Sequence, residues 1–297
     1  MSYRHSLLTA AVLAAVSQTV MSAELSGTLK RIDQNGEIVL GFRDSAIPFS
    51  YLANGKEPVG YSVDISRKVV EEVRKTLNKP GLRVRYNMVT GQTRIPLLQN
   101  GTIDLECGAT TNNAERQRQV DFSLAFFEVG TRLMTRSSAG IGDFPDLKGK
   151  NVVVSAGTTS ERLLRAYNAD RKLGMNIVAA KDNGESFLML QTGRVAAFMT
   201  DDAMLYGERA KAAKPQDWVV TGQPQSRERY GCMLRKGDPA FKAVVDRAIA
   251  NTFKSGEINT IYRKWFEQPI PPKGLNLSFP MSPSLKAIIN KPTDQPA

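Results

Sequence analysis

The chain has 297 residues, a length that indicates about two domains of ordinary size. Apolar residues make up 41% and charged residues 23%, which excludes a mostly disordered, collagen-like or disulfide-scaffold protein. The 40 basic residues exceed the 29 acidic ones by 11. This surplus favours acidic partners by electrostatic steering but carries no information about the fold.

Residues 1–23 have the layout of a secretory signal peptide. A positively charged start precedes an apolar run from Leu7 to Val16, and two small residues, Ser22 and Ala23, close the segment. A bilayer-spanning helix needs about 20 apolar residues, so the length of this run disfavours the alternative of a permanent N-terminal anchor. We therefore expect a cleaved signal peptide and an exported, periplasmic mature protein.

The sequence contains a single histidine, His5, which lies inside that signal segment. Ser–His–Asp catalysis, Cys–His catalysis and most histidine metal sites need an imidazole, so the mature chain lacks the means for them. Carboxylate or Ser–Lys catalysis stays open. We therefore expect no catalytic residues, no metal site and no cofactor, and an enzyme is disfavoured rather than excluded.

The sequence has two cysteines, Cys107 and Cys232. In an exported chain this number favours one intrachain disulfide, and the alternative is two separate buried thiols. A disulfide would make these two positions neighbours in space, so the chain between them would fold outward and return. Closing so long a loop would stabilise the folded state by about 4–5 kcal/mol in the chain-entropy description.

Short apolar runs alternate with amphipathic helical patterns, which predicts an α/β fold. The first part of the chain predicts strands at 37–42, 82–86 and 103–105 and helices at 61–77, 94–99 and 112–118. An extended segment at 126–136 leads to a second unit, with strands at 151–155, 177–179 and 195–200 and helices at 160–171, 186–191 and 203–212. A second extended segment at 229–235 precedes helices at 239–253 and 257–266 and a proline-rich tail from 269.

The unit between the two extended segments has the size of a small domain. Because a disulfide would join residues on either side of it, we expect one lobe made of two pieces of sequence. The second lobe is inserted between these pieces, and two crossing strands link the lobes. The expected boundaries are 24–130 with 231–297 for the first lobe and 131–230 for the second. We expect the tail to be extended and packed over the first lobe, with a disordered end as the alternative.

Three turns between a strand and a helix carry charged or hydroxyl side chains. Thr158 and Glu161 fit a capping box, and the free N–H groups of such a helix start form a seat for a carboxylate, although a plain cap is the alternative. Arg116 lies near the start of the next candidate helix, where a cation is disfavoured, which predicts that it binds a carboxylate. Asp202 is predicted to cap the helix that follows it, so Asp201 is left to face a cationic amine.

Two further arginines, Arg43 and Arg94, lie at expected strand ends, the edge at which α/β sheets bind ligands. Each alone is typical of a solvated surface arginine, but with the three turns they mark one side of both lobes. The chain has no phosphate-binding glycine loop, and its basic residues are scattered rather than striped. We therefore expect no nucleic-acid partner.

Eight stretches of the chain match the pattern of one known family. They are residues 95–108 (IPLLQNGTIDLECG), 110–117 (TTNNAERQ), 120–123 (VDFS), 129–133 (VGTRL), 155–161 (SAGTTSE), 197–202 (AFMTDD), 230–236 (YGCMLRK) and 269–273 (PIPPK). Through them nearly all of the mature chain resembles the extracytoplasmic solute-binding proteins of amino-acid ABC transporters, specifically the glutamate/aspartate-binding type. The resemblance implies a two-lobed α/β clamshell of the type II periplasmic-binding-protein kind, which closes on one amino acid.

The resemblance also implies a role for each candidate residue. Arg116 would bind the α-carboxylate of the ligand, helped by the backbone N–H groups of Thr111 and Thr159. Asp201 would pair with the α-ammonium group. Two arginines would hold the side-chain carboxylate, namely Arg43 and Arg94.

Three positions depart from the pattern of the family that the chain resembles. Gly91 and Ala109 stand where the family has serine, and Asn183 stands where it has histidine. These changes make the expected site roomier and poorer in hydrogen-bond donors, so they bear on ligand preference; Asn183 is kept as a candidate ligand-binding residue. The resemblance further implies that Cys107 and Cys232 are bonded to each other.

Two classes of function remain. The leading one is a monomeric receptor that captures glutamate or aspartate and delivers it to the permease subunits of an ABC transporter. The alternative is an exported enzyme of the dehydratase or lyase kind on the same clamshell, which needs a proton-transfer group close to the reacting atom. Every acid that we place in the cleft already has a charge partner, so the receptor is favoured.

Overall fold

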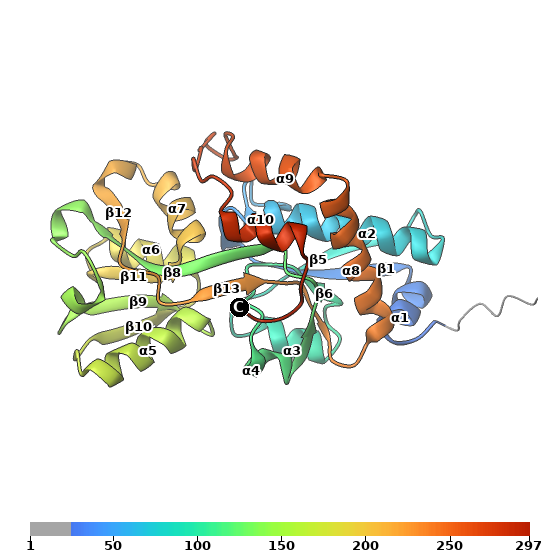
Figure 1. The fold of residues 1–297 in the computed structure, drawn as a ribbon, viewed down its shortest axis with the longest axis horizontal. Coiled ribbons are helices and arrows are strands. Elements are labelled where there is room, and N and C mark those ends of the chain that lie inside the picture. Colours follow the sequence, from blue (N-terminus) through green and yellow to red (C-terminus); the bar gives the residue numbers. More distant parts are fainter. Residues whose placement is uncertain (1–24) are drawn as a thin grey trace, which may run out of the picture.

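The structure is a computed structural model that describes residues 25–297, so the expected signal segment lies outside the described residues. Two sheet-containing lobes lie side by side along the longest axis of the molecule (Figure 1). Both combine strands with helices, which confirms the predicted two-lobed α/β fold. Within the described residues, no helix has the length and apolar content that a membrane span requires.

The first lobe is built on a five-stranded sheet with the strand order β5–β1–β6–β14–β7. Its strands are β1 (Glu37–Phe42), β5 (Arg83–Met88), β6 (Leu105–Glu106), β7 (Val120–Phe122) and β14 (Met233–Arg235). β1 pairs in parallel with β5 and β6, whereas β14 comes from the far end of the sequence and pairs antiparallel with β6 and β7. A small antiparallel sheet consists of β2 (Ser45–Ala46), β3 (Ser50–Leu52) and β4 (Pro58–Val59).

The helices of the first lobe pack on this sheet and on one another. They are α1 (Gly27–Asn35), α2 (Tyr61–Leu77), α3 (Arg94–Gln99), α4 (Ala114–Gln117), α8 (Pro239–Lys254), α9 (Glu257–Phe266) and α10 (Pro283–Asn290). In α2, Ile65, Val69 and Val73 recur at helical spacing and are fully buried. This apolar stripe holds α2 against the sheet and against α8.

The second lobe carries a six-stranded sheet in which β10, β9, β11, β8 and β12 follow one another and β13 pairs with β8. Its strands are β8 (Phe127–Arg136), β9 (Asn151–Ser155), β10 (Asn176–Ala180), β11 (Ala197–Asp201), β12 (Trp218–Thr221) and β13 (Arg227–Tyr230). Its helices are α5 (Thr159–Arg171), α6 (Asn183–Gln191) and α7 (Asp202–Lys211), with short 3-10 turns η1 (Ser137–Ala139), η2 (Phe144–Leu147) and η3 (Pro215–Asp217). Separate apolar clusters fill the two faces of this sheet.

The two lobes are linked by β8 and β13, which Figure 1 shows passing between them. The start of β8 pairs antiparallel with β13, and its later part pairs with β11 and β12 inside the second lobe. This confirms the two crossing strands that the extended segments at 126–136 and 229–235 predicted. The second of these segments is divided into β13 and β14.

Cys107 and Cys232 form a disulfide, as predicted. The two cysteines are only 4% and 0% exposed. Cys107 follows β6 and Cys232 precedes β14, two strands that pair in the same sheet. The bond therefore ties the chain before the second lobe to the chain that returns from it.

The C-terminal segment 269–297 packs over the first lobe, as expected, but its helix α10 was not predicted. The backbone N–H of Ala125 donates to the carbonyl of Thr293 at 2.8 Å. The segment also reaches the second lobe, because the rings of Phe279 and Tyr206 of α7 lie 5.4 Å apart. In Figure 1, α10 lies across the region where the two lobes meet.

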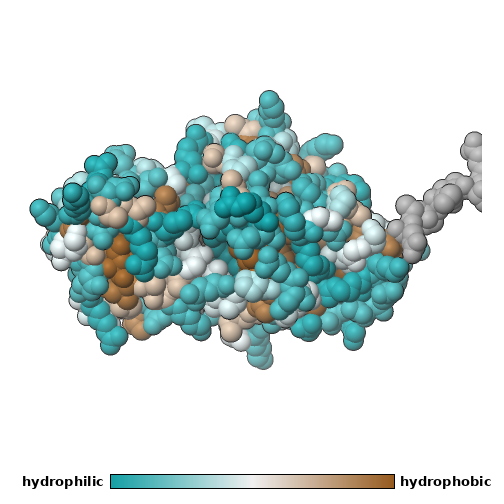
Figure 2. Space-filling model, turned by 90° about the horizontal axis from the view of Figure 1, so that it is seen from below, coloured by the Kyte–Doolittle hydropathy of each residue, from teal (hydrophilic) through white to brown (hydrophobic). Residues whose placement is uncertain are grey.

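Figure 2 shows one face of the molecule, on which hydrophilic residues dominate and hydrophobic ones form small separate groups. Large apolar side chains that are exposed in the described residues are Met88, Leu188 and Val219. They come from different elements, β5, α6 and β12. The buried polar and charged residues between the lobes need an explanation of their own, because buried charges require partners.

Candidate functional site

The seven expected ligand residues face one another where the two lobes meet. The first lobe contributes Arg43 after β1, Arg94 at the start of α3, and Thr111 and Arg116 before and within α4; the second contributes Thr159 at the start of α5, Asn183 at the start of α6 and Asp201 at the end of β11. All seven are between 2% and 7% exposed. The alternative interpretation, that Arg43 and Arg94 are solvated surface arginines, is therefore wrong.

The lobes touch each other at this site. A guanidinium N–H of Arg116 donates to the carbonyl oxygen of Gly157 in the second lobe, over 3.4 Å. A Cβ atom built on Gly91 of the first lobe would lie 2.5 Å from the carbonyl oxygen of Ala156. The structure therefore shows the lobes in a closed arrangement.

One end of the site holds two buried guanidinium groups. Nη1 of Arg94 donates to the carbonyl oxygen of Ala109 at 3.2 Å and to the hydroxyl of Thr110. Burial, together with the positive charge of Arg94, lowers the pKa of Arg43 to about 10, and Glu106 opposes this shift. The Nε atoms of Arg43 and Arg94 have no hydrogen-bond partner among the described residues. Unpartnered buried N–H donors on cations fit an anion.

Glu106 was not predicted as a site residue, and it changes the charge count. It is fully buried, and its Oε1 accepts from the backbone N–H of Gly108 at 2.8 Å. Its Oε2 accepts from the hydroxyl of Thr110 at 2.7 Å, and the same hydroxyl accepts from Arg94. Sequence reasoning left two uncompensated cations, Arg43 and Arg94, at this end. Counting the fully buried side chains Arg43, Arg94 and Glu106, the structure corrects the excess to a single positive charge, and the half-buried Asp44 and Asp182 also act on Arg43.

The other end of the site holds Arg116. Its Nη1 donates to the carbonyl oxygen of Thr111 at 2.9 Å. Burial and the charge of Arg94 lower the pKa of Arg116 to about 9, against the opposing effect of Glu228 and two other acids. Because α4 is a single turn of four residues, Arg116 is not a cation placed at the start of a long helix. The sequence argument that Arg116 is a disfavoured cation at a helix start was therefore wrong. Arg116 nevertheless lies in the site, as expected.

Asp201 faces Arg116 from the second lobe. Its Oδ2 accepts a hydrogen bond from the hydroxyl of Tyr230, and its Oδ1 has no partner among the described residues. Burial, and then the charge of Glu228, raise the pKa of Asp201 well above its usual range. A cation at Oδ1 would relieve this destabilisation.

The capping prediction for the helix after β11 needs correction. α7 begins at Asp202, and Asp201 takes the N-cap position without a capping hydrogen bond from its side chain. Asp202 instead accepts from the neighbouring N–H of Ala203 at 2.7 Å. The physical reason is that the carboxylate of Asp201 is turned toward Tyr230 and is not available to the helix. The expectation that Asp201 faces the site is unaffected.

The predicted capping box at the start of α5 is half confirmed, because Thr158 caps the helix but the side chain of Glu161 reaches back to Gly157 instead of Thr158. The hydroxyl of Thr158 accepts from the N–H of Glu161 at 3.2 Å, and Glu161 accepts from the N–H of Gly157 at 2.9 Å. Thr159 is the first helical residue, and the first N–H groups of a helix lack partners inside it. The hydroxyl of Thr159 donates to Oε2 of Glu228 at 2.7 Å.

Asn183 lies at the start of α6, whose cap is the side chain of Asp182. Its Oδ1 accepts from the hydroxyl of Ser155 at 2.6 Å, and its Nδ2 donates to the sulfur of Met204 at 3.1 Å. These partners belong to the second lobe. Asn183 therefore forms a fixed wall of the site at the end near Arg43, whose pKa responds to the charge of Asp182.

Sequence reasoning missed three buried polar residues: Glu106, Glu228 and Tyr230. Glu106 lies between the apolar residues Leu105 and Cys107, which is an unusual place for a solvated acid. Glu228 and Tyr230 alternate with charged residues, and positions two apart share one face of a strand. That alternation is the signal that could have identified them.

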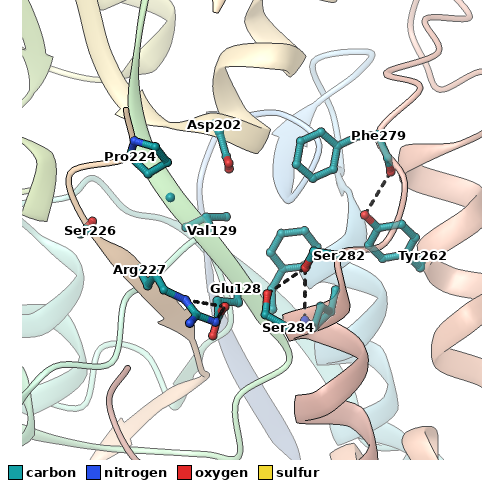
Figure 3. Close-up of a pocket in the computed structure, with 13 residues that line it drawn as sticks. Glu128, Val129, Asp202, Pro224, Ser226, Arg227, Tyr262, Phe279, Ser282 and Ser284 are labelled. Atoms are coloured by element: carbon teal, nitrogen blue, oxygen red, sulfur yellow. Dashed lines mark hydrogen bonds and ion pairs between the residues drawn. The ribbon is translucent and has the colours of Figure 1, made fainter. Parts of the chain in front are cut away.

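A hollow lies beside β8 and β13, the two linking strands that form the hinge between the lobes (Figure 3). Its polar groups differ from those of the interlobe site in having partners. Two of its charged groups pair with each other, since Nη2 of Arg227 donates to Oε1 of Glu128 at 2.5 Å, and the third, Asp202, accepts from the backbone N–H of Ala203. The hydroxyl of Tyr262 donates to the carbonyl oxygen of Phe279 at 3.0 Å, and the hydroxyls of Ser282 and Ser284 lie 3.0 Å apart. At the interlobe site, by contrast, Nε of Arg43, Nε of Arg94 and Oδ1 of Asp201 have no hydrogen-bond partner among the described residues, and these atoms face one another across the lobes, which makes that site the candidate. Across residues 25–297, no cluster of His, Cys, Asp or Glu could hold a metal ion.

Comparison with known proteins finds similar chains over nearly the whole length. An L-glutamate/L-aspartate-binding protein of Pseudomonas aeruginosa is 66% identical over 295 residues, which cover 98% of this chain and 97% of that protein. A glutamate/aspartate import solute-binding protein of Escherichia coli (strain K12) is 52% identical over 290 residues, 97% of this chain and 96% of that protein. A crystal structure of a mutant ArgBP from T. maritima, 26% identical, has a TM-score of 0.72 and covers 81% of this chain and 100% of its own.

The family assignment rests on most of the chain. Residues 38–268 match the bacterial extracellular solute-binding proteins, family 3. This range includes both sheets, both linking strands and every residue of the interlobe site. The chain belongs to the bacterial extracellular solute-binding proteins of family 3.

Proposed function

We propose that the protein is a periplasmic receptor that captures glutamate or aspartate between its lobes and delivers it to the permease of an ABC transporter. Relatives that are 52–66% identical carry the names of glutamate/aspartate-binding or import proteins. One observation carries the choice of an acidic ligand. Arg43 and Arg94 are buried with unpartnered Nε atoms, and Glu106 is the fully buried acid among the three that act on Arg43, the other two being the half-buried Asp44 and Asp182.

The end of the site near Arg116 suits the part that all α-amino acids share. Arg116 binds the α-carboxylate through its guanidinium group, and the backbone N–H groups of Thr111 and Thr159 complete the contact. Asp201 receives the α-ammonium group at Oδ1, the oxygen atom that Tyr230 does not occupy. Each charge of the zwitterion then has a partner of opposite sign.

The end of the site near Arg43 and Arg94 selects the side chain. The fully buried side chains at this end, two arginines and Glu106, sum to one positive charge, which a single side-chain carboxylate neutralises. Asn183 closes the site from the second lobe. Gly91 and the neighbouring Ala109 add no hydroxyl group, so charge rather than hydroxyl bonding would govern the preference.

The ligand would also hold the lobes together. Because Arg116 and Asp201 lie on different lobes, a ligand bound to both favours the closed state over the open one. We place the lobe boundaries at 24–130 with 231–297 and at 131–230, so that closure occurs about β8 and β13. The receptor works as a monomer, without a nucleic-acid partner.

An enzyme on the same clamshell is not favoured. The relatives with the highest identity carry the names of transport binding proteins. At the site, Asp201 is bonded to Tyr230, Glu106 to Gly108 and Thr110, and Glu228 to two threonine hydroxyls. Glu106 and Glu228 are thus engaged in holding the site together, and the one free carboxylate oxygen among the described residues of the site, Oδ1 of Asp201, is assigned to the ammonium group of the ligand.

Isothermal titration calorimetry with glutamate, aspartate, glutamine and asparagine tests this proposal. We expect the two acids to bind at least about a hundredfold more tightly than their amides, which corresponds to about 2.8 kcal/mol. Arg94→Met should abolish most of this preference. Arg85→Met is the matched control, because Arg85 lies in β5 with its side chain 53% exposed and paired with Glu37. Glutamine binding within tenfold of glutamate, or an Arg94→Met variant that keeps the preference, would contradict the assignment.

A further inference from the structure

One carboxylate in the hinge is held by three hydroxyl groups. Glu228 lies in β13 opposite Val129 of β8 and is only 4% exposed. Its Oε2 accepts hydrogen bonds from the hydroxyls of Thr111 and Thr159, the latter at 2.7 Å. Its Oε1 accepts from the hydroxyl of Ser226 at 3.0 Å. Because Thr111 belongs to the first lobe and Thr159 to the second, a single oxygen atom joins the two lobes.

This double contact requires the closed arrangement. Opening the lobes moves Thr111 and Thr159 apart, and one oxygen atom cannot stay within hydrogen-bonding distance of both. Hydrogen bonds to an ionised carboxylate are stronger than those between neutral groups. The closed state therefore keeps a charge-assisted bond that the open state loses.

A second contact on the same strand supports this picture. Tyr230 lies two residues after Glu228, on the same face of β13. Its hydroxyl donates to Asp201 of the second lobe, while its backbone forms a bridge with Thr111 of the first. This face of β13 therefore contacts both lobes through two consecutive inward-facing residues.

We propose that Glu228 is a positioning residue that fixes Thr111 and Thr159 in their ligand-binding arrangement and thereby slows ligand release. The inference rests on the proposed function, in which the backbone N–H groups of these two threonines bind the α-carboxylate. Glu228 acts through the threonine side chains. Its own charge would repel the ligand carboxylate, so direct contact between the two is disfavoured.

Stopped-flow measurement of glutamate binding and release tests the proposal, with Thr159→Val as the first variant. Valine keeps the shape and the backbone N–H of Thr159 but removes the hydroxyl that reaches Glu228. We expect the dissociation rate to rise ten- to hundredfold, equivalent to about 1.4–2.8 kcal/mol, while the association rate stays within about threefold of wild type. A residue that only supports the fold would not produce this separation of the two rates.

A double-mutant cycle identifies Glu228 as the partner. In a Glu228→Gln background the bond to Thr159 is already weakened, so Thr159→Val should raise the dissociation rate by a much smaller factor. Glu128→Gln is the matched control, because Glu128 is a hinge glutamate of the neighbouring strand that is 8% exposed and pairs outward with Arg227 (Figure 3). The control should leave both rates at the wild-type values. If Glu228→Gln does not fold, Thr111→Val combined with Thr159→Val takes its place, because it removes both lobe donors and keeps the carboxylate.

The outcomes separate this inference from the proposed function. A wild-type protein that binds glutamate, with a Thr159→Val variant that releases it at the wild-type rate, overturns the positioning role alone. Equal effects of Thr159→Val with and without the carboxylate of Glu228 also overturn it. A wild-type protein that does not bind glutamate overturns the proposed function and the inference together.

Discussion

Gly207 of α7 lies directly against the backbone of Ile47, across the contact between the lobes. A Cβ atom built on Gly207 would lie 2.4 Å from the carbonyl oxygen of Ile47, a separation that real Cβ atoms essentially never show. The backbone φ of Gly207 is outside the left-handed region, so alanine is compatible with α7 itself. Glycine, which has no side chain, is therefore needed at position 207 for the closed arrangement of the lobes and not for the helix.

We accordingly expect Gly207→Ala to hold the lobes partly open. Its affinity for glutamate should fall at least about tenfold, which corresponds to about 1.4 kcal/mol. Small-angle scattering at saturating glutamate should give a larger radius of gyration than wild type. Gly81→Ala is the control, because no atom lies within 4 Å of a Cβ atom at that position. A Gly207→Ala variant with wild-type affinity and wild-type radius would show that this contact does not limit closure.

Removing the charge of Glu106 should sharpen selection between acidic ligands and their amides. In Glu106→Gln, Arg43 and Arg94 lose the carboxylate that offsets part of their charge, so an uncharged ligand side chain leaves two buried cations unpaired. We expect the ratio of glutamate to glutamine affinity to rise about tenfold, with a lower melting temperature of the ligand-free protein. Calorimetry should compare the affinity ratio of this variant with that of Glu37→Gln. The latter is the control because Glu37 pairs with Arg85 at the surface. An unchanged ratio would mean that Glu106 does not set the charge of the site.

The disulfide should stabilise the first lobe without contributing to ligand affinity. Cys107 and Cys232 are buried beside β6 and β14, and neither is among the residues proposed to touch the ligand. Replacing both by serine should lower the free energy of unfolding by about 2–5 kcal/mol while glutamate affinity stays within about threefold. Thermal unfolding and calorimetry measure the two effects. Titration of two free thiols in denatured, unreduced wild type would contradict the bond itself.

Glu208 should make the free energy of unfolding depend on pH, independently of the ligand. Burial raises its pKa to about 7, against the effect of Lys211, whose Nζ lies 2.5 Å from Oε2. Because the folded pKa lies above the unfolded one, the contribution to stability is fully present below about pH 4.5 and is lost as the pH rises through about 7. Glu208→Gln should flatten the pH dependence in this window and stabilise the protein at pH 8, by about 3 kcal/mol. A variant whose stability follows the wild-type pH profile would exclude this residue as the cause.

Elements with strong periodicity and clear end signals could be predicted from the sequence. The expected strand at 37–42 and the helices at 61–77 and 257–266 agree with β1, α2 and α9 at both ends. For α2 the reason is local, since Asn78 ends the helix in a left-handed conformation and a proline follows at position 80. The pairs of residues that form β2 and β4 depend on tertiary contacts and leave no comparable pattern. The expected helix at 186–191 begins at Asn183, because the side chain of Asp182 caps it.

The site could be located from the sequence, but its charge balance could not. Arg43 follows the buried strand β1 and Asp201 ends the buried strand β11, and the ends of such strands lie at the edge of a sheet where ligands bind, so their position is predictable. Glu228 lies in a run of charged residues that resembles a solvated strand. Its burial arises only from pairing with β8 and from contact with Thr159, more than sixty positions away in the chain. The alternation along β13 can indicate that Glu228 shares a face with Tyr230, but its contact with Thr159 depends on how the two lobes meet, which no local pattern in the sequence encodes.

A crystal structure of the protein grown with glutamate tests the central claim most directly. We predict one glutamate between the lobes, with its α-carboxylate at Arg116 and its ammonium group at Oδ1 of Asp201. Its side-chain carboxylate should lie between Arg43 and Arg94, within hydrogen-bonding distance of their guanidinium groups. Density for glutamate anywhere else, or a site that stays without ligand at saturating concentration, would contradict the account.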